Sequence, residues 1–417
     1  MQQRGKWVQL AFLCAIFFVY TVDRAFLGLM AIPIQRETGI GDVAFGFLNS
    51  AIFWTYACCV PFAGLIGDLF DRRRIIGVAT LLWSSFAVLS GFANSFWSLL
   101  ILVSVAITVP QTLYGPAANS LIAASHLRTK TLAMSLHQAA YYAGWFASGA
   151  IVACVLRLFG SWRVAYLVFG TLGLGLGTVF LLANRDRTSC TVQASVARRA
   201  TVNSLAASLR AFVGCPSAVL AASGYVMMVF VACGYCAWGP KFISLKFGLS
   251  PSAAGTGVMF WHYAASFVAI LVAGGLTDRY VRRFPRFRLA LQVSMLLLAT
   301  PMLTVFGFAG HASVAFAAAA VYGLVRGLFE ANQILSVFDV VAPAYHASAV
   351  GFLNVLAGTI GALSPILLGL LSSRDGVRGL EVGFALLGAT LLVAAVLMSI
   401  SFFHTFEHDR IKEGLSD

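Results

Sequence analysis

The stretch GLIGDLFDRRR (Gly64–Arg74) places two acidic residues and three consecutive arginines between two long apolar runs. A second version, GGLTDRYVRR (Gly274–Arg283), repeats the glycine, the aspartate and the paired arginines at the same spacing. Charged side chains are costly in the hydrocarbon of a membrane, so both stretches are expected in loops that face water. The repeat predicts a chain built from two similar halves.

The composition predicts an integral membrane protein made of helices. The chain has 417 residues, of which 60% are hydrophobic and 10% are charged, whereas soluble domains contain about 25% charged residues. A membrane-spanning helix needs about 20 apolar residues, and a dozen runs of that order use most of the length. Short segments of alternating polarity, which would indicate an outer-membrane barrel, are missing from the sequence.

We therefore expect an all-α integral membrane protein with twelve transmembrane helices in two pseudo-symmetric six-helix bundles. The predicted helices are 9–32, 44–66, 74–93, 96–122, 132–156, 163–183, 217–241, 252–275, 287–309, 312–337, 347–371 and 381–404. A polar stretch rich in Ser, Thr, Ala and Arg separates six helices from six. The predicted domains are an N-terminal bundle (1–183), a cytoplasmic linker (184–216), a C-terminal bundle (217–406) and a cytoplasmic tail (407–417).

The basic residues predict the orientation. Lys and Arg are retained on the cytoplasmic side of membrane proteins. The termini and the even-numbered loops together carry 19 of them, and the odd-numbered loops carry 7. Both termini are therefore expected in the cytoplasm, with the chain in a bacterial inner membrane. We interpret the net charge of +13 as a topology signal, and expect no nucleic-acid partner.

The duplicated pattern Gly-x-x-x-Asp-x-x-x-Arg-Arg after helices 2 and 8, together with twelve helices and a basic linker, resembles the major facilitator superfamily. Leu69 and Asp71 depart from that family's pattern, which often has Arg and Gly there. The resemblance implies secondary transport. It also implies that these loops form a cytoplasmic gate, with the contributing residues Asp68, Arg72, Arg73, Asp278, Arg279 and Arg282.

A finer resemblance begins at Thr21-Val22-Asp23-Arg24 in the first helix. An Asp-Arg pair at this place is similar to the anion:cation symporter branch and to spinster-type transporters. Those branches usually carry an Arg and a Glu in helix 4, where this sequence has Ser104 and Gln111. Because Gln111 does not titrate, the proton site that the resemblance would place in helix 4 is in doubt.

Four Asp, Glu or Arg residues fall inside predicted helices and away from the helix ends, where a charge costs about 2.5–3.5 kcal/mol on insertion scales. They are Asp23 and Arg24 in the first helix, and Arg326 and Glu330 in the tenth. The i, i+4 spacing of Arg326 and Glu330 predicts an ion pair on one helix face. We interpret both arginines as substrate anchors, and Asp23 and Glu330 as proton-coupling residues; the alternative is that all four are ion pairs that fix packing.

Other polar side chains in apolar helices are further candidates for substrate binding. The histidines among them are more often hydrogen-bonded packing residues. The candidates are Tyr56, His137, Gln138, Tyr141, His262, Asn332 and Asn354.

The sequence favours symport of a small organic anion with protons, by alternating access and as a monomer in the lipid bilayer. The alternatives are a spinster-like carrier of a lysolipid or other amphiphile, a proton-coupled exporter, and, more remotely, a membrane-embedded enzyme. The enzyme is disfavoured because the H-E-x-x-H and G-x-S-x-G motifs are missing from the sequence. No phosphate-binding loop and no metal-ligand spacing is found in the sequence, so we expect no cofactor and no metal site.

Overall fold

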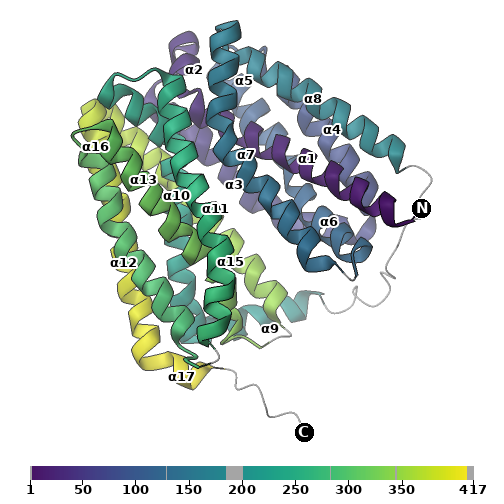
Figure 1. The fold of residues 1–417 in the computed structure, drawn as a ribbon, viewed down its shortest axis with the longest axis vertical. Helices are drawn as coiled ribbons and strands as arrows, with labels where there is room; N and C mark the ends of the chain where they lie inside the picture. Colours follow the sequence, from purple (N-terminus) through teal and green to yellow (C-terminus); the bar gives the residue numbers. More distant parts are fainter. Residues whose placement is uncertain (1, 128, 185–200, 282, 343–344, 411–417) are drawn as a thin grey trace. The chain divides into compact units, whose positions relative to one another are not determined.

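The structure is a computed structural model that describes residues 2–127, 129–184, 201–281, 283–342 and 345–410. Helices account for nearly all of these residues, and no strand occurs among them. The predicted all-α fold class is confirmed. Figure 1 shows the helices in chain order, from purple at the N-terminus to yellow at the C-terminus.

The described part of the first half of the chain contains nine helical segments. The loops between them are short, and two of the helices end at glycines in the left-handed conformation, Gly39 and Gly160. The segments are α1 (Gln2–Leu29), α2 (Ala31–Thr38), α3 (Asp42–Leu69), α4 (Arg72–Ser90), α5 (Phe96–Leu99), η1 (Leu100–Ile107), α6 (Thr108–Ser125), α7 (Lys130–Phe159) and α8 (Trp162–Ala183).

The second half begins with a helix that falls inside the predicted linker. This helix, α9 (Thr201–Val213), was not predicted from the sequence, and linker residues 185–200 lie outside the described residues. The other segments are α10 (Pro216–Phe247), α11 (Pro251–Val281), α12 (Phe287–Phe308), α13 (Ala312–Glu330), α14 (Gln333–Phe338), α15 (His346–Gly361), α16 (Leu363–Ile400), η4 (Ser401–Thr405) and α17 (Phe406–Asp409).

Helices long and apolar enough to cross a membrane occur along the whole described chain. Eleven such runs are found among the described residues, and the last, Ser348–Asp409, is 62 residues long. A helix of that length would extend over about 90 Å, about three times the hydrocarbon thickness. Its backbone is broken at Gly376, with φ 56° and ψ −125°. The run therefore contains the eleventh and twelfth predicted helices, and the expected count agrees with the structure.

The chain divides into two compact units. Unit 1 comprises Met1–Val196 and Cys236–Phe260, and unit 2 comprises Ala197–Tyr235 and Trp261–Asp417. The division falls within α10 and α11, so the C-terminal part of α10 and the N-terminal part of α11 belong to unit 1. The predicted domain boundaries stay a prediction.

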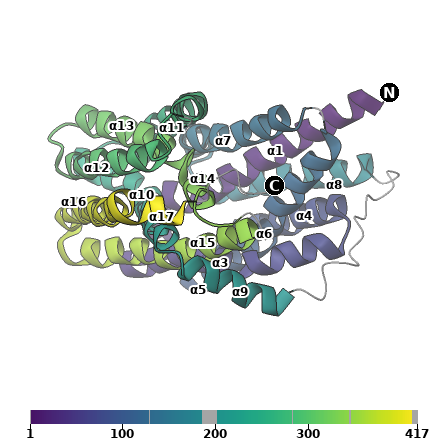
Figure 2. The ribbon, with the colours of Figure 1, turned by 90° about the horizontal axis from the view of Figure 1, so that it is seen from below.

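Each unit is held together by long helix pairs. In unit 1, α4 packs along α8 and α1 packs along α7. In unit 2, α12 packs along α16, as Figures 1 and 2 show. Small residues allow the helix backbones to approach closely: a Cβ added at Gly144 of α7 would lie 2.7 Å from Cβ of Thr21 on α1. This contact fixes α1, which carries the Asp-Arg pair, against α7.

Irregular backbone occurs in several predicted helices, including the fourth and the tenth. The fourth is interrupted by the π-helix η1, and the tenth is broken between α13 and α14 at Ala331 and Asn332. Such irregularities often occur at functional sites, and broken helices are typical of transporter binding sites. Both lie beside the intramembrane charged residues described below.

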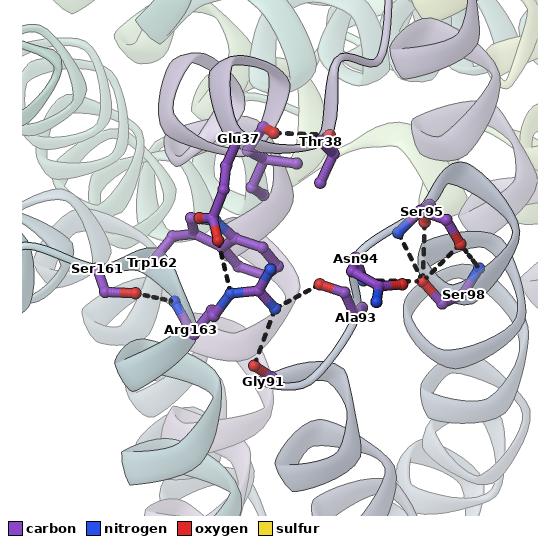
Figure 3. Close-up of polar contacts among 11 residues, drawn as sticks. Glu37, Thr38, Gly91, Ala93, Asn94, Ser95, Ser98, Ser161, Trp162 and Arg163 are labelled. Atoms are coloured by element: carbon purple, nitrogen blue, oxygen red, sulfur yellow. Dashed lines mark hydrogen bonds and ion pairs between the residues drawn. The ribbon is translucent and has the colours of Figure 1, made fainter.

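The first, third and fifth interhelical connections meet at one end of unit 1 (Figure 3). Arg163 Nε lies 2.9 Å from Glu37 Oε1, and its Nη1 donates to the carbonyl oxygens of Gly91, at 3.1 Å, and Ala93. Trp162 Nε1 donates to Glu37 Oε2 at 2.5 Å. Three loops that were predicted to share one side of the membrane are thus joined around one arginine.

Candidate functional site

The residues of the predicted cytoplasmic gate are described only in part. Arg282 and the side chains of Asp68 and Asp278 lie outside what the structure describes. Arg72 and Arg73 are half-buried and Arg279 is exposed. The gating role of all six residues stays a prediction.

Asp71, which departs from the family pattern, has a clear structural role at the start of α4. Its Oδ1 accepts hydrogen bonds from the backbone N–H of Arg73 at 2.8 Å and of Arg74 at 3.4 Å. Asp71 is therefore the N-cap of α4, where an acid also interacts favourably with the helix dipole.

Arg24 lies among aromatic side chains in a membrane-spanning part of α1. Its Nη1 donates to the hydroxyl of Tyr20 at 3.1 Å, and its guanidinium carbon lies 4.9 Å from the ring centre of Tyr56 and 5.4 Å from that of Phe53. Among the residues that the structure describes, no carboxylate oxygen lies within 4 Å of its guanidinium nitrogens. The cationic side chain thus contacts two aromatic rings, and no carboxylate among the described residues neutralises its charge.

Asp23 lies beside Arg24 but faces α6 and is 6% exposed. Gln111 Nε2 donates to its Oδ2 at 3.4 Å. Gln111 thus contacts the Asp-Arg pair from the helix-4 position where related branches usually carry Glu. Oδ1 of Asp23 is buried and has no hydrogen-bond partner among the residues that the structure describes.

A small cavity lies beside this pair inside unit 1. The volume that the centre of a water molecule can occupy in it is about 10 Å³. The π-helix η1 contributes Val103 and Ile107 to the wall. The residue after Val103, Ser104, donates a hydrogen bond from its hydroxyl to the Leu48 carbonyl at 2.9 Å. The full lining is Asp23, Arg24, Leu27, Ile52, Val103, Ile107, Thr108, Gln111 and Tyr166.

In unit 2, Arg326 has the acidic partner that the sequence spacing predicted. Its Nε lies 2.7 Å from Glu330 Oε1, and its Nη1 lies 3.1 Å from His262 Nε2. A guanidinium only donates hydrogen bonds, so His262 accepts through Nε2 and carries its proton on Nδ1. Tyr263 places its ring centre 5.5 Å from the guanidinium carbon. Arg326 is thus enclosed by a carboxylate, an imidazole and an aromatic ring.

Two glycines of α13 position this cluster. A Cβ added at Gly323 would lie 2.0 Å from the His262 carbonyl oxygen, and one added at Gly327 would lie 2.4 Å from that of Ser266. The Ser266 hydroxyl also donates to the Gly323 carbonyl at 2.7 Å. The small residues four apart bring the backbones of α11 and α13 together, so that His262 reaches Arg326.

Three further candidates lie in unit 1. His137 is buried, with Nε2 2.9 Å from the Tyr114 hydroxyl. Because that hydroxyl donates to the Leu13 carbonyl at 2.7 Å, His137 donates through Nε2. Tyr141 packs on Phe17 with ring centres 5.2 Å apart, and Gln138 is exposed. His137 therefore occupies a hydrogen-bonded packing position, while the predicted binding roles remain untested.

The two remaining asparagine candidates lie in unit 2. Asn332 is buried, and its Nδ2 donates to the Leu328 carbonyl at 3.1 Å, which closes the end of α13. Asn354 Oδ1 accepts a hydrogen bond from the Tyr225 hydroxyl at 2.7 Å. Asn332 thus stabilises the helix break directly after Glu330.

The structure brings the predicted residues together in two groups, Arg24 with Tyr56, and Arg326 with Glu330 and His262. The two arginines belong to different compact units, so their convergence on one substrate stays a prediction. Tyr20, Phe53 and Tyr166 were missed by the sequence reasoning. Tyr20 precedes Arg24 by four residues, and this helical spacing was a signal that would have found it.

Comparison with known families agrees with this architecture. The family model of the Major Facilitator Superfamily matches residues 12–365. The chain belongs to the Major Facilitator Superfamily. The resemblance inferred from the duplicated loop motif is confirmed, and the chain belongs among transporters rather than enzymes.

Curated relatives of this major facilitator fall into several transport groups. It is 25% identical over 317 residues to Protein spinster of Drosophila melanogaster, covering 72% of the chain but 50% of the length of that protein. It is 23% identical to an MFS-type efflux pump of Mycolicibacterium smegmatis, covering 94% and 90% of the two chains. It is 24% identical to the "Probable sulfoacetate transporter SauU" of Cupriavidus necator, covering 95% and 94%.

Solved structures of other transporters share the fold. A bacterial homolog of the human lysosomal transporter spinster, in an inward-facing and unoccupied conformation, matches with a TM-score of 0.82 and 19% identity over 98% of this chain and 99% of that chain. The nucleoside transporter NupG matches with a TM-score of 0.70 and 13% identity over 95% and 99%. The predicted major facilitator fold, with twelve helices in two bundles, is thereby confirmed.

Proposed function

We propose that this chain is a secondary transporter that moves a small organic anion across a bacterial inner membrane together with protons. The observation that carries the proposal is the environment of Arg24, a cation in a membrane-spanning helix with aromatic and hydroxyl contacts but no carboxylate within 4 Å among the described residues. An intramembrane charge of this kind is a functional candidate by default.

The aromatic contacts of Arg24 favour a cation but do not neutralise it. A cation–π contact contributes about 0.5–2 kcal/mol and leaves the full positive charge in place. A carboxylate, sulfonate or phosphate would neutralise that charge and accept two parallel hydrogen bonds from the guanidinium. The site therefore favours an anionic substrate with an oxygen-rich head group.

The two intramembrane arginines have unequal roles in this proposal. Arg326 is held by Glu330 at 2.7 Å, so Arg24 is the primary anchor of the anion. When Glu330 takes up a proton, Arg326 loses its partner carboxylate and becomes available to the substrate. Asp23 is the second coupling acid. Proton binding and anion binding are thereby linked. A monomer with both termini in the cytoplasm then carries proton and anion across the membrane by alternating access.

Similarity to the "Probable sulfoacetate transporter SauU", over 95% of this chain and 94% of that protein, supports this choice. The second candidate is a spinster-like carrier of a lysolipid or other amphiphile, favoured by the spinster relatives and by the fold match with a TM-score of 0.82. An exporter is the third, favoured by the efflux-pump relative. A lysolipid phosphate would also satisfy Arg24, so substrate size, rather than charge, separates the first two.

Flux measurements in proteoliposomes test the proposal. Radiolabelled small carboxylates and sulfonates, and separately lysolipids, are offered under an imposed proton gradient, and the recovered compound is analysed chemically. We expect intact small anions to accumulate in the direction of the proton gradient and Arg24→Gln to abolish this uptake. The matched control is Arg157→Gln, since Arg157 is exposed at the end of α7. Transport of lysolipids alone would overturn the small-anion proposal.

A further inference from the structure

Two residues that line the same cavity of unit 1 each have a buried oxygen that makes no hydrogen bond within the described part of the chain. These oxygens are Oδ1 of Asp23 and the hydroxyl oxygen of Tyr166, whose residues are 6% and 0% exposed. An unsatisfied buried polar group costs about 1–3 kcal/mol, so two of them at one cavity call for a common partner. The first comes from α1 and the second from α8.

The cavity has the size and polarity that a single water molecule requires. A bound water needs about 10–15 Å³ of space and two to four polar partners, and the cavity offers about 10 Å³. Asp23 Oδ1 and the Tyr166 hydroxyl supply two partners, and Thr108 also lines the wall. The remaining lining comprises the donors Arg24 and Gln111 and four apolar side chains.

We propose that this cavity binds one water molecule between Asp23 Oδ1 and the Tyr166 hydroxyl, and that Tyr166 is the positioning residue for it. The inference rests on the proposed coupling role of Asp23, but it concerns a water site that is distinct from the proposed anion site at Arg24. The water is identified by chemistry: it is small, neutral, and able both to donate and to accept.

That dual capacity matters because Asp23 must be accommodated in two protonation states. Gln111 Nε2 faces Oδ2 and only donates, so it matches an oxygen that carries no proton. Oδ1 is the oxygen left for the proton. A water there donates to the carboxylate and, after reorienting, accepts from the carboxylic acid. Arg24 also lines the cavity and has no such capacity, since a guanidinium only donates.

The surroundings of Tyr166 hold its hydroxyl in a fixed position. Its ring makes edge-to-face contacts with Phe26, at 5.4 Å between centres, and with Trp162, at 6.0 Å. Trp162 is in turn bonded to Glu37 at 2.5 Å (Figure 3). A side chain so constrained loses little entropy on binding the water, which is what a positioning residue requires.

Infrared difference spectroscopy tests the water site on the purified full chain without measuring transport. A difference spectrum is recorded between acidic and alkaline conditions. The carboxylic-acid C=O band that is missing from this spectrum in Asp23→Asn is assigned to Asp23. We expect Tyr166→Phe to move this band. Exchange into H₂¹⁸O should shift an O–H stretching band of the bound water in the unchanged protein but not in Tyr166→Phe. Identical spectra for the unchanged protein and Tyr166→Phe would overturn the proposal.

Two controls make the result specific. Tyr114→Phe removes a buried hydroxyl that bonds Leu13 and His137 outside the cavity, and it should leave the Asp23 band in place. Replacing sodium with choline in the buffer should also leave the band in place; a sodium-dependent band would instead identify the occupant as a cation and overturn the water. Loss of small-anion flux with the Asp23 and water bands intact would count against the proposed function and not against this site.

Discussion

Lys241 of α10 donates from Nζ to Gln35 Oε1 at 2.6 Å and forms an ion pair with Asp42 at the start of α3. Gln35 Nε2 in turn donates to Asp42 Oδ1 at 2.8 Å, so the three side chains form a closed set of hydrogen bonds. Nearby, a Cβ added at Gly28 would lie 2.4 Å from the Cys236 carbonyl oxygen. Hydrogen bonds, an ion pair and close backbone packing thus join α10 to α1 and α3 within unit 1.

Replacing Lys241 with Met should weaken this junction measurably. The Lys241 side chain is 9% exposed and that of Asp42 is 21% exposed, so the loss should lie between that of a surface and a buried ion pair, about 1–3 kcal/mol. Thermal unfolding in detergent is expected to show a midpoint several degrees lower.

The control for this variant is Lys130→Met, which removes an exposed lysine and should leave the midpoint within about one degree, as most surface substitutions do. The double variant with Asp42→Asn should lose less than the sum of the single variants because the partners interact directly. Fully additive losses would show that the pair contributes no energy.

Gly323→Ala is predicted to disrupt unit 2. The new Cβ would lie 2.0 Å from the His262 carbonyl oxygen, which is backbone and has little freedom to move. The α11 and α13 helices must separate, and His262 then no longer reaches Arg326. We expect a large fall in the yield of folded protein or in its thermal midpoint. Gly351→Ala is the matched control, since nothing lies within 4 Å of the added atom, and a similar fall in both variants would refute the packing argument.

Features set by local spacing could be predicted from the sequence. The Arg326–Glu330 pair follows from residues four apart on one helix, and the structure contains it. The membrane spans follow from the length of apolar runs, and Gly376 separates the last two. Such features need no knowledge of which helices become neighbours.

Features that depend on neighbouring helices could not be predicted. Tyr166 lies more than a hundred residues from Asp23 in the sequence, yet both line one cavity. The π-helix that turns Val103 and Ile107 toward that cavity has no signature in an evenly apolar stretch. The partners of Lys241, Gln35 in α2 and Asp42 at the start of α3, lie about two hundred residues earlier in the sequence, so its charge alone indicated only topology. Tertiary packing decides all three.

Arg24→Lys is expected to weaken substrate affinity while preserving the charge. Lysine lacks the planar pair of donors that matches a carboxylate or sulfonate, and it would lose the hydrogen bond to Tyr20. We predict a 10-fold to 100-fold rise in the dissociation constant, which is about 1.4–2.8 kcal/mol, measured by isothermal titration or scintillation proximity. Arg157→Lys, at an exposed site, should bind as the unchanged protein does. Unchanged affinity in Arg24→Lys would exclude bidentate anchoring.

Neutralising the proposed coupling acids should separate binding from energy conversion. Asp23→Asn and Glu330→Gln keep the size of each side chain and remove its ability to take up a proton, so each should abolish accumulation against a gradient under a pH difference. Exchange of labelled for unlabelled substrate across the membrane needs no net proton movement and should persist. In Glu330→Gln, Arg326 loses its 2.7 Å ionic partner, so anion affinity at neutral pH should rise. Full pH-driven accumulation by both variants would place the coupling site elsewhere in the chain.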